Sequence, residues 1–565
     1  MAEPYETTRQ ECKRRWKDMT DERASWEPQW KDIAQYIRPG AYQANTSESG
    51  KGIKRGSRII NNTPIRASNT LASGMMSGIT SPSRQWFRLT TGDTSISEVS
   101  GVRGWLDYVT RVLLETFAGS NFYTALHTLY FDLADIGTGV MFMEEDTEEA
   151  IRCYVWTPGT YVLAASDRGQ IDTAGRQISM TVANVVGKFG YEKCSQELQA
   201  AYDEDKYQKR FNVMHMVYPN EDYNPRMAGP KGMRWKSCWF EEAGDDRLPC
   251  LRESGYHEFP VMAPRWTATE SVYGRGPGLE ALDDSKSLQL LERQKARMAQ
   301  KIVDPPMNAP MSMMTQRASL VPGDVNYIAE TGSGTTFKPV YEIDHAAIQV
   351  AEGACREVEN RIRETYYVPL WLSMTDSDRR QITAEEIRAR QQEKMQMLGP
   401  VMERLDPELL APIILRAVAI LARGLKLPPP PKELKGKFKI EYLSILAQAQ
   451  KLVGTTSIER LLQFTGQMAQ AGKPEAMDKL NTDEMVDAYA DAVGAATKLV
   501  LPDDQVSQIR KQRAQAQQQQ QQMAMAQAQA THAQTLSQTD TGGDNALTQL
   551  AGALPGVAQA GIGQA

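Results

Sequence analysis

Cysteine and histidine are the first candidates for chemistry in this sequence of 565 residues, because their side chains bind metals and act as nucleophiles or bases. The spacing of Cys238, Cys250 and His257 matches no zinc-binding pattern, and "HEFPV" at His257 lacks the second histidine of a metalloprotease helix. The six cysteines include no C-x-x-C pair, which favours free thiols in a reducing compartment. We therefore expect buried thiols, a structural histidine, and neither a metal nor another cofactor.

Phosphate binding is the second candidate chemistry, and it depends on a glycine-rich loop. In "SESGKGI", Gly52 rather than Ser or Thr follows Lys51, so this stretch is interpreted as a plain loop. The sequence has neither G-x-G-x-x-G nor the G-x-S-x-G of a nucleophile elbow. Acidic clusters at Met143–Glu149 and Asp203–Lys206 are typical of solvated surfaces. No enzymatic activity is predicted.

The composition limits how the protein could handle nucleic acid. It has 41% apolar and 24% charged residues, which is ordinary for a globular protein, and a formal net charge of −6. This charge argues against electrostatic gripping of nucleic acid but allows a protein that lets nucleic acid slide past. The most apolar stretch, Glu408–Leu425, is interrupted by Pro412 and Arg416, which predicts a core helix, no membrane contact and a cytoplasm-like setting.

The N-terminal part of the chain is predicted to be helical. Apolar residues recur at helical spacing over the first forty residues, with a break near Ser25–Pro28. A further helix is expected to open at Thr63 as its N-cap, with Pro64 in the first turn. Both segments are expected to present one apolar face to a core.

Two more helices and a set of strands are expected next. The helices are at about Val102–Phe117 and Phe122–Ile136, and Asn121 caps the second while Gly137 ends it. Short strand-like runs then follow from Val140 to Met180, and "FNVMHMVYP" and "SCWFEEA" indicate further strands. This pattern predicts a β-meander against helices, in an α+β fold that is mainly helical.

The middle of the chain predicts a helical hairpin. Long helices are expected at Pro277–Val303 and Ile343–Tyr367, with β-like pieces between them, and "VPLWLSMTDSDRRQ" is interpreted as an irregular connector. Another long helix is expected to start at Thr383, with Glu386 completing a capping box. It carries prolines at positions 400, 407 and 412, so it must bend or break.

In addition to these patterns, several stretches along the chain resemble the head-to-tail connector, or portal, family of short-tailed, T7-like bacteriophages. They include "FDLADIGTGVMF", "YVLAASDRGQIDTAGRQISM", "ESGYHEFPVMAPRW", "YGRGPGLEALDDSKSLQ", "PPMNAP", "ITAEEIRARQQEKMQMLGPVMERLDPELLAPIILRA" and "IEYLSILAQAQKL". They occur in family order from about residue 10 to 450. The resemblance implies a portal subunit in a ring-shaped homo-oligomer, of about twelve copies, around a channel for double-stranded DNA.

The resemblance also implies a division of the chain. It gives a wing (1–276), a first stem helix (277–303), a β-rich clip (304–341), a second stem helix (342–367), a tunnel loop (368–381), a long kinked helix returning to the wing (382–452), a crown (453–502), a barrel helix (503–538) and a flexible C-terminal end (539–565). The barrel helix is the Gln- and Ala-rich tract, which is built of good helix formers but would be marginal alone.

Candidate site residues follow from these parts. Most charges of the stem helices are expected in salt bridges, with Lys295 and Lys301 as channel-facing candidates. The tunnel-loop candidates for DNA contact are Asp376, Asp378, Arg379 and Arg380. The clip candidates for ring contacts and for motor or adaptor docking are Pro305, Pro306, Asp324, Tyr327 and Lys338.

The implied function is a channel at one capsid vertex through which DNA is packaged and ejected. The implied partners are the terminase large subunit, a tail adaptor or tail tube protein, and the major capsid and scaffolding proteins. The protein would be located in the virion after assembly in the host cytoplasm. The alternatives are another structural component of virion assembly or a packaging enzyme, and the missing phosphate loop argues against the enzyme.

Overall fold

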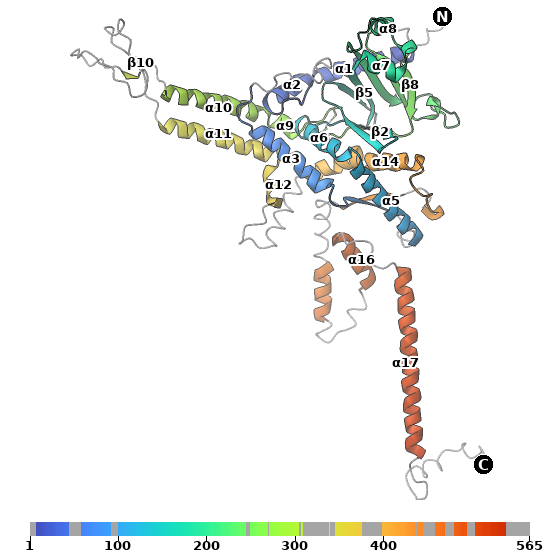
Figure 1. Ribbon diagram of the computed structural model, residues 1–565. Helices are drawn as coiled ribbons and strands as arrows, with labels where there is room; N and C mark the ends of the chain where they lie inside the picture. The colour runs from blue at the N-terminus through green and yellow to red at the C-terminus, as the bar shows by residue number, and fades with distance from the viewer. Residues whose placement is uncertain are drawn as a thin grey trace. The chain divides into compact units, whose positions relative to one another are not determined.

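The computed structural model describes most of the chain and divides it into two compact units (Figure 1). The described residues are 7–43, 58–91, 100–243, 249–268, 270–303, 307–308, 338–339, 345–375, 398–434, 438–443, 458–468, 480–493 and 503–537. The first unit comprises Met1–Ser97 and Gly101–Gly494, and the second Glu98–Ser100 and Ala495–Ala565.

The N-terminal helices agree with the expected pattern in all but one cap. Helices α1 (Thr8–Ala24) and α2 (Glu27–Tyr36) confirm the predicted break. Helix α3 (Thr63–Ile79) begins as expected, but Thr63 is its first helical residue and not its N-cap. The cap is supplied from further upstream, since the Asn61 side chain accepts a hydrogen bond from the Thr63 N–H at 2.9 Å.

The next two helices are α5 (Ser100–Gly119) and α6 (Phe122–Asp135). Asn121 is at the N-cap position of α6, but its side chain makes no cap hydrogen bond. It binds the backbone of Cys153 instead, with distances of 2.9 Å from the Cys153 N–H and 2.7 Å to its carbonyl. Gly137 ends the helix with φ +88°, as predicted.

The strands form two main antiparallel sheets where one meander was expected. The first has the order β3-β2-β9 and the second the order β4-β5-β6-β7-β8. Their bounds are β2 (Met141–Asp146), β3 (Ala150–Val155), β4 (Tyr161–Ala165), β5 (Ile171–Thr181), β6 (Arg210–Pro219), β7 (Trp235–Glu241), β8 (Arg252–Tyr256) and β9 (Val261–Met262). The predicted strands are present, and they fall into two sheets because β3 pairs with β2 whereas β4 pairs with β5. The first sheet also contains β9, whose two residues give almost no sequence signal.

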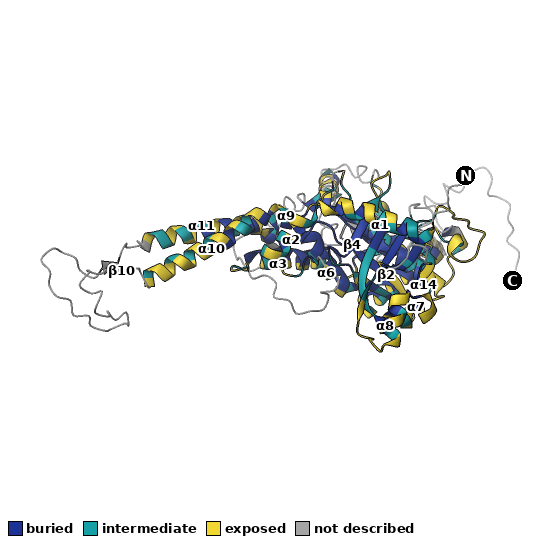
Figure 2. Cartoon of the chain, turned by 90° about the horizontal axis from the view of Figure 1, so that it is seen from above, coloured by how far each residue is buried: buried dark blue, intermediate teal, exposed yellow. Residues whose placement is uncertain are grey.

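Short elements cover and join these sheets. They are β1 (Phe87–Thr90), which pairs with β12 (Lys439–Tyr442), helices α7 (Val182–Phe189) and α8 (Gln196–Asp203), and the 3-10 turns η2 (Tyr191–Lys193), η3 (Pro230–Gly232) and η6 (Lys432–Leu434). Figure 2 shows buried residues gathered around β2, β4 and α6. The main core includes Trp30, Trp86, Phe117, Tyr130 and Trp156.

The expected helical hairpin is present. It consists of α9 (Pro277–Glu280), α10 (Leu282–Val303) and α11 (His345–Thr365), and α10 and α11 lie side by side (Figures 1 and 2). Between them, β10 (Met307–Asn308) pairs antiparallel with β11 (Lys338–Pro339). The prediction of an irregular connector at 368–381 is wrong for its first half, because Val368–Thr375 forms helix α12. Thr383 and Glu386 lie outside the described residues.

The prolines were expected to bend or break this long helix, and the structure has a π-helical turn inside a continuous helix over residues 398–423. Residues 398–405 are helical, a π-helical turn η5 follows at Asp406–Leu410 around Pro407, and α14 continues over Ala411–Arg423. Further along, residues 458–468 are helical and α16 spans Thr482–Val493. In the second unit, α17 spans Asp503–Ser537, the Gln-rich tract, for which a helix that depends on neighbouring subunits was expected. Within the described ranges, no helix is both long and apolar enough to span a bilayer.

Candidate functional site at the base of the helix pair

Ion pairs connect α10 and α11 to each other and to the body. Arg361 on α11 pairs with Asp284 on α10 at 2.8 Å, and Lys286 on α10 pairs with Asp32 on α2 at 2.7 Å. Further pairs lie within single helices: Lys295–Glu292, Arg356–Glu352, Arg361–Glu357 and Arg363–Glu359. The expectation that most of these charges form salt bridges is confirmed.

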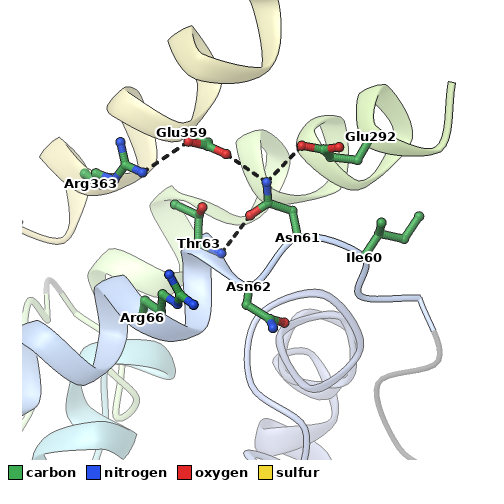
Figure 3. Close-up of a pocket in the computed structure, with 8 residues that line it drawn as sticks. All are labelled: Ile60, Asn61, Asn62, Thr63, Arg66, Glu292, Glu359 and Arg363. Atoms are coloured by element: carbon green, nitrogen blue, oxygen red, sulfur yellow. Dashed lines mark hydrogen bonds and ion pairs between the residues drawn. The ribbon is translucent and has the colours of Figure 1, made fainter. Parts of the chain in front are cut away.

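A polar pocket of about 440 Å³ lies where α3 begins against the two helices (Figure 3). Asn61 is at its centre and donates from one amide nitrogen to Glu292 on α10 at 3.0 Å and to Glu359 on α11 at 2.8 Å. The same side chain caps α3 through the Thr63 N–H. The pocket is lined by Ile60, Asn61, Asn62, Thr63, Arg66, Glu292, Glu359 and Arg363. One asparagine therefore links three helices.

Gln289 reinforces this link from α10. Its carbonyl oxygen accepts the N–H groups of Ile60 and Asn61 at 2.6 and 2.9 Å, and its amide donates to the Asn61 carbonyl at 2.9 Å. The residue is 2% exposed. Because a buried amide must find partners for its polar atoms, Gln289 fixes the segment before α3 against the helix pair.

Three glycines before α10 allow direct backbone contact with the end of α6. A Cβ atom on Gly274 would lie 2.4 Å from the Gly137 carbonyl, and one on Gly276 would lie 2.7 Å from the Leu133 carbonyl. On Gly278 it would lie 2.2 Å from the Asp135 carbonyl. The stretches "FDLADIGTGVMF" and "YGRGPGLEALDDSKSLQ", distant in sequence, therefore meet backbone to backbone.

A buried charged network joins the same helix end to α2 and α11. Arg38, just after α2, pairs with Asp132 and Asp135 on α6, with both nitrogen–oxygen distances at 2.5 Å. Tyr366, just after α11, donates from its hydroxyl to Asp135 at 3.0 Å. Asp135 and Tyr366 are 0% exposed and Asp132 is 4% exposed, so these bonds are shielded from water.

Burial shifts the titration of this network. Removal from water raises the pKa of Asp132 to about 6, an effect that Arg38 opposes and Asp135 increases. The two carboxylates hold the pKa of the Arg38 guanidinium above its usual value despite its burial. Burial, with the nearby Asp135 charge, raises the pKa of Tyr366 well above its ordinary range. Arg38 therefore stays charged, and Tyr366 stays a hydrogen-bond donor.

Two arginines attach the π-helical turn and α14 to the first sheet. Arg265 donates to both carboxylate oxygens of Glu408, with a shortest distance of 2.5 Å. Arg416, 2% exposed, donates to the Met143 carbonyl at 3.0 Å and to the Glu258 carbonyl at 3.1 Å. These contacts bring together further stretches on which the family resemblance depends, "ESGYHEFPVMAPRW" and "LDPELLAPIILRA".

Helix α12 connects the helix pair to α3 through one close contact. Tyr367 turns the chain with φ +55° between α11 and α12. Trp371 on α12 then packs on Gly74 of α3, where a Cβ atom would lie 2.3 Å from the indole ring. The first part of the expected tunnel loop (368–381) is therefore helix α12, which packs on α3 at Gly74.

The structure places only some of the predicted site residues. Lys295 is ion-paired with Glu292 at 2.8 Å and its side chain is 29% exposed, while Lys301 is exposed in the last turn of α10. Lys338 belongs to β11, where it pairs with Asn308. Outside the described residues lie Asp376, Asp378, Arg379, Arg380, Pro305, Pro306, Asp324 and Tyr327.

Sequence reasoning missed the residues that build the base. Asp132 and Asp135 are three apart in an otherwise apolar helix, which places two carboxylates near one buried face and could have indicated a buried cation partner. Thr63 and Pro64 indicated where α3 begins, but Asn61 gave no sign of its bridge to α10 and α11.

The cysteines are buried free thiols among the described residues, as expected. Cys238, Cys250 and Glu253 place possible metal-ligand atoms within 4.8 Å of one another. His257 is exposed and not part of this group, so the expected structural role for it is wrong. His215 is the buried histidine instead, 4.0 Å from Trp239 in a stacked arrangement, and burial lowers its pKa to about 3.

Taken together, these contacts define a structural class of protein, an α+β body whose buried ion pairs and backbone contacts hold two long helices in place. Residues 9–501 match the family described as "Bacteriophage head to tail connecting protein". The chain is 39% identical over 553 residues to a "Portal protein" of Salmonella phage epsilon15, covering 97% of this chain and 99% of that protein. It is 37% identical to a "Probable portal protein" of Bordetella phage BPP-1, covering 98% and 100%.

A more distant relative is a "Portal protein" of Enterobacteria phage T3, 20% identical over 88% of this chain and 89% of that protein. The chain belongs to the bacteriophage head-to-tail connecting protein family, which confirms the resemblance found in the sequence. Its function is that of a portal protein, a virion component that connects head and tail.

Proposed function

We propose that this chain forms a closed ring of about twelve copies at one capsid vertex, and that double-stranded DNA passes through the ring during packaging and ejection. The observation that carries the proposal is the ion pairing of the α10–α11 pair in a member of the portal family. A channel for a polyanion must surround its cargo without holding it, and paired cations attract phosphates less than unopposed ones.

The helix pair is the proposed stem of this channel. Its residues Lys286, Lys295 and Arg361 each have a carboxylate within 2.8 Å. Lys301, at the end of α10, and Lys295 remain the proposed channel-facing residues, where one basic side chain per subunit makes a circle of charge. Sliding is therefore favoured over binding along most of the stem.

The remaining parts of the proposal follow the order of the chain. Residues 1–276 form the wing, 304–341 the clip, 368–381 the tunnel loop, 453–502 the crown and 503–538 a barrel helix inside the capsid. The β10–β11 pairing supports a β-rich clip, whose edges can pair with neighbouring subunits. The proposed tunnel-loop contacts with DNA are Asp376, Asp378, Arg379 and Arg380.

The proposed partners are proteins that meet such a ring on its different sides. The clip, including Pro305, Pro306, Asp324, Tyr327 and Lys338, docks the terminase motor and then the tail adaptor. The wing and crown contact the major capsid and scaffolding proteins during assembly in the host cytoplasm. No catalysis by this chain is part of the proposal.

Electron microscopy of the purified protein tests the ring. We expect rings with a central hole and about twelve-fold symmetry. Monomers or open filaments would contradict the proposal and favour another structural role in assembly. ATP turnover by the purified chain would favour the packaging enzyme instead.

Charge substitutions test the channel. We expect Lys295→Gln and Lys301→Gln to change the amount or rate of DNA packaged while rings still form. Lys206→Gln is the matched control, because Lys206 is exposed beyond α8 and pairs only locally with Glu204 at 2.6 Å. Equal packaging by all three variants would remove both lysines from the channel.

Deletion of residues 304–341 tests the clip separately. The expected result is a folded wing without ring assembly or motor docking, measured by circular dichroism and electron microscopy. Intact rings that still package DNA would rule out this role.

A further inference from the structure

Three cysteines meet in the apolar layer between α1 and the five-stranded sheet, where α1 contacts β4 and β7. Cys238 on β7 and Cys250 just before β8 place their sulfur atoms 2.8 Å apart. Cys12 on α1 completes the group, 3.6 Å from the Tyr218 hydroxyl and in contact with the Cys238 thiol. The portal role described above does not use this thiol cluster.

Cys238 and Cys250 meet outside the paired register of β7 and β8. Strand β7 pairs antiparallel with β8, and Cys238 lies opposite Glu253 in this register. Cys250 precedes Glu253 by three residues and lies before β8 begins, so strand pairing alone does not bring it to Cys238. Both side chains belong to the buried cluster that also contains Cys12, and packing in this cluster holds the two sulfur atoms together.

The distance between the two sulfur atoms helps to distinguish a zinc site from a disulfide. Two sulfurs on one tetrahedral zinc ion, each about 2.3 Å from the metal, are roughly 3.8 Å apart, whereas the sulfurs of a disulfide are about 2.05 Å apart. At 2.8 Å the pair lies somewhat closer to the disulfide distance. Zinc would have to push the thiols apart inside a packed core.

The apolar side chains around Cys238 and Cys250 also favour a disulfide over a bound zinc ion. The side chains packed around the thiols include Met19, Val162, Met214, Met216 and Phe240. A zinc ion held by two thiolates and Glu253 would place net charge in this apolar layer, and buried charge is strongly disfavoured without compensation. A disulfide is neutral and leaves no thiol hydrogen to satisfy.

We propose that Cys238 and Cys250 are an oxidation site, kept as a dithiol in the reducing host cell and converted to an intramolecular disulfide in the released particle. The compartment argument is general, because thiols stay reduced in a cytoplasm and oxidise outside it. The proposal rests on the virion location, but its chemistry is measurable on unassembled chains.

A peroxide is a sufficient oxidant for this step. Cys250, 7% exposed, is reached before Cys238, which is 0% exposed. The Cys250 thiolate attacks one peroxide oxygen, the O–O bond breaks, and the departing hydroxide takes up the thiol proton as water, leaving a sulfenic acid. The Cys238 sulfur then attacks the Cys250 sulfur, the S–O bond breaks, and a second water leaves with the Cys238 proton. The two thiols lose two electrons to the peroxide.

Peptide mass spectrometry tests the site directly. Full-length protein is taken from host cells and from released particles, and a third sample is treated with hydrogen peroxide. Free thiols are blocked with N-ethylmaleimide under denaturing conditions before digestion. We expect a cross-linked Cys238–Cys250 peptide in the particle and peroxide samples, and both residues alkylated in the cell sample.

Two serine variants act as a matched pair. Cys250→Ser should abolish the cross-link and the rise of several degrees in unfolding temperature that peroxide gives the wild type. Cys153→Ser should keep both, because Cys153 is equally buried but belongs to the other core cluster. If Cys250→Ser fails to fold, the wild-type cross-link alone still decides.

Three outcomes would overturn the proposal. One is complete alkylation of Cys238 and Cys250 after peroxide treatment and in released particles. Another is a cross-link from Cys12 to Cys238, which would pin α1 to β7 instead. The third is stoichiometric zinc, measured by elemental analysis, that protects both thiols. Failure of ring formation would leave the cross-link measurable, so the two proposals can fail separately.

Discussion

The base of the helix pair and the Gln-rich helix α17 show two different ways in which a helix is specified. At the base, Arg38, Asp135, Tyr366 and Gln289 are mostly buried and each is bonded to another element. In α17, every residue from Ser507 to Ala528 is exposed within its own unit. The base is therefore specified by tertiary contacts, whereas α17 is specified by composition.

This difference determines where substitutions matter. A residue of the base that loses its partner leaves buried charge or unsatisfied polar atoms, which cost far more than helix propensity. A residue of α17 between Ser507 and Ala528 changes mainly helix propensity, since its side chain is exposed. Substitutions in the two regions should therefore differ several-fold in their effect on the folded body.

The largest effect is expected for Arg38→Met. This change leaves Asp132 and Asp135 without their cation in a buried site, so we expect a loss of about 3–5 kcal/mol in the free energy of unfolding. Urea unfolding followed by tryptophan fluorescence measures it. Adding Asp132→Asn and Asp135→Asn should recover part of the loss, because the uncompensated charges are then absent.

The exposed Lys206 provides the control for Arg38→Met. Lys206→Met removes a surface ion pair and should leave the unfolding midpoint unchanged within error. If Arg38→Met were as stable as Lys206→Met, the base would not depend on its buried charges.

Gly137→Ala should have the next largest effect. Gly137 has φ +88°, and a Cβ atom there would lie 2.4 Å from the Gly276 backbone nitrogen, so both strain and a clash oppose the substitution. We expect a loss of about 2–4 kcal/mol in the free energy of unfolding. Thermal unfolding of the purified variant checks this.

Gly104 is the matched control for glycine. It lies inside α5 with nothing within 4 Å of a Cβ atom. Gly104→Ala should stabilise the protein by roughly 0.5–1 kcal/mol through helix propensity. A loss of stability for Gly137→Ala together with a gain for Gly104→Ala would show that the close approach matters, and changes of the same sign would contradict it.

A pH dependence should reveal the buried network. The pKa of Asp132 is about 6 in the folded protein and near 3.8 when exposed, so the folded state holds this proton more tightly. Stability from this group is then fully present below about pH 4 and falls as pH rises to about 6, by up to roughly 3 kcal/mol. The difference in unfolding free energy between wild type and Asp132→Asn, measured from pH 4 to 7, should show this slope. A flat difference would mean that Arg38 fully compensates the burial.

The contrast between the two regions also explains what the sequence could predict. Most helices and strands and the irregular turn at Pro407 follow from local patterns, and the structure contains them. Thr63 was predicted as the N-cap of α3, but the N-cap position is Asn62, and Asn121 makes no cap hydrogen bond. The side chains of Asn61 and Asn121 instead bind partners far along the chain. Local patterns carry no information about such partners.

The candidate site shows the same limit more strongly. The salt bridges of α10 and α11 could be expected from charge spacing alone. The meeting of Gly137 with Gly276, and of Arg38 with Asp132, joins residues about a hundred or more positions apart. Only the tertiary structure brings such residues together. Helix α12, at Val368–Thr375, was predicted as part of an irregular connector.

The smallest effect on the body is expected in α17, for Gln519→Pro. Proline breaks a helix interior locally by about 3 kcal/mol, so helical circular dichroism should fall. The free energy of unfolding of the first unit should stay within error of the wild type, because Gln519 is exposed and α17 belongs to the other unit. Gln519→Ala, which removes the same side chain and favours the helix, is the control.

In a ring, parallel copies of α17 could supply the contacts that one copy lacks. Amide exchange of 503–537 should therefore be slower in rings than in monomers for the wild type, but not for Gln519→Pro. Equal exchange in wild-type rings and monomers would show that propensity alone maintains this helix.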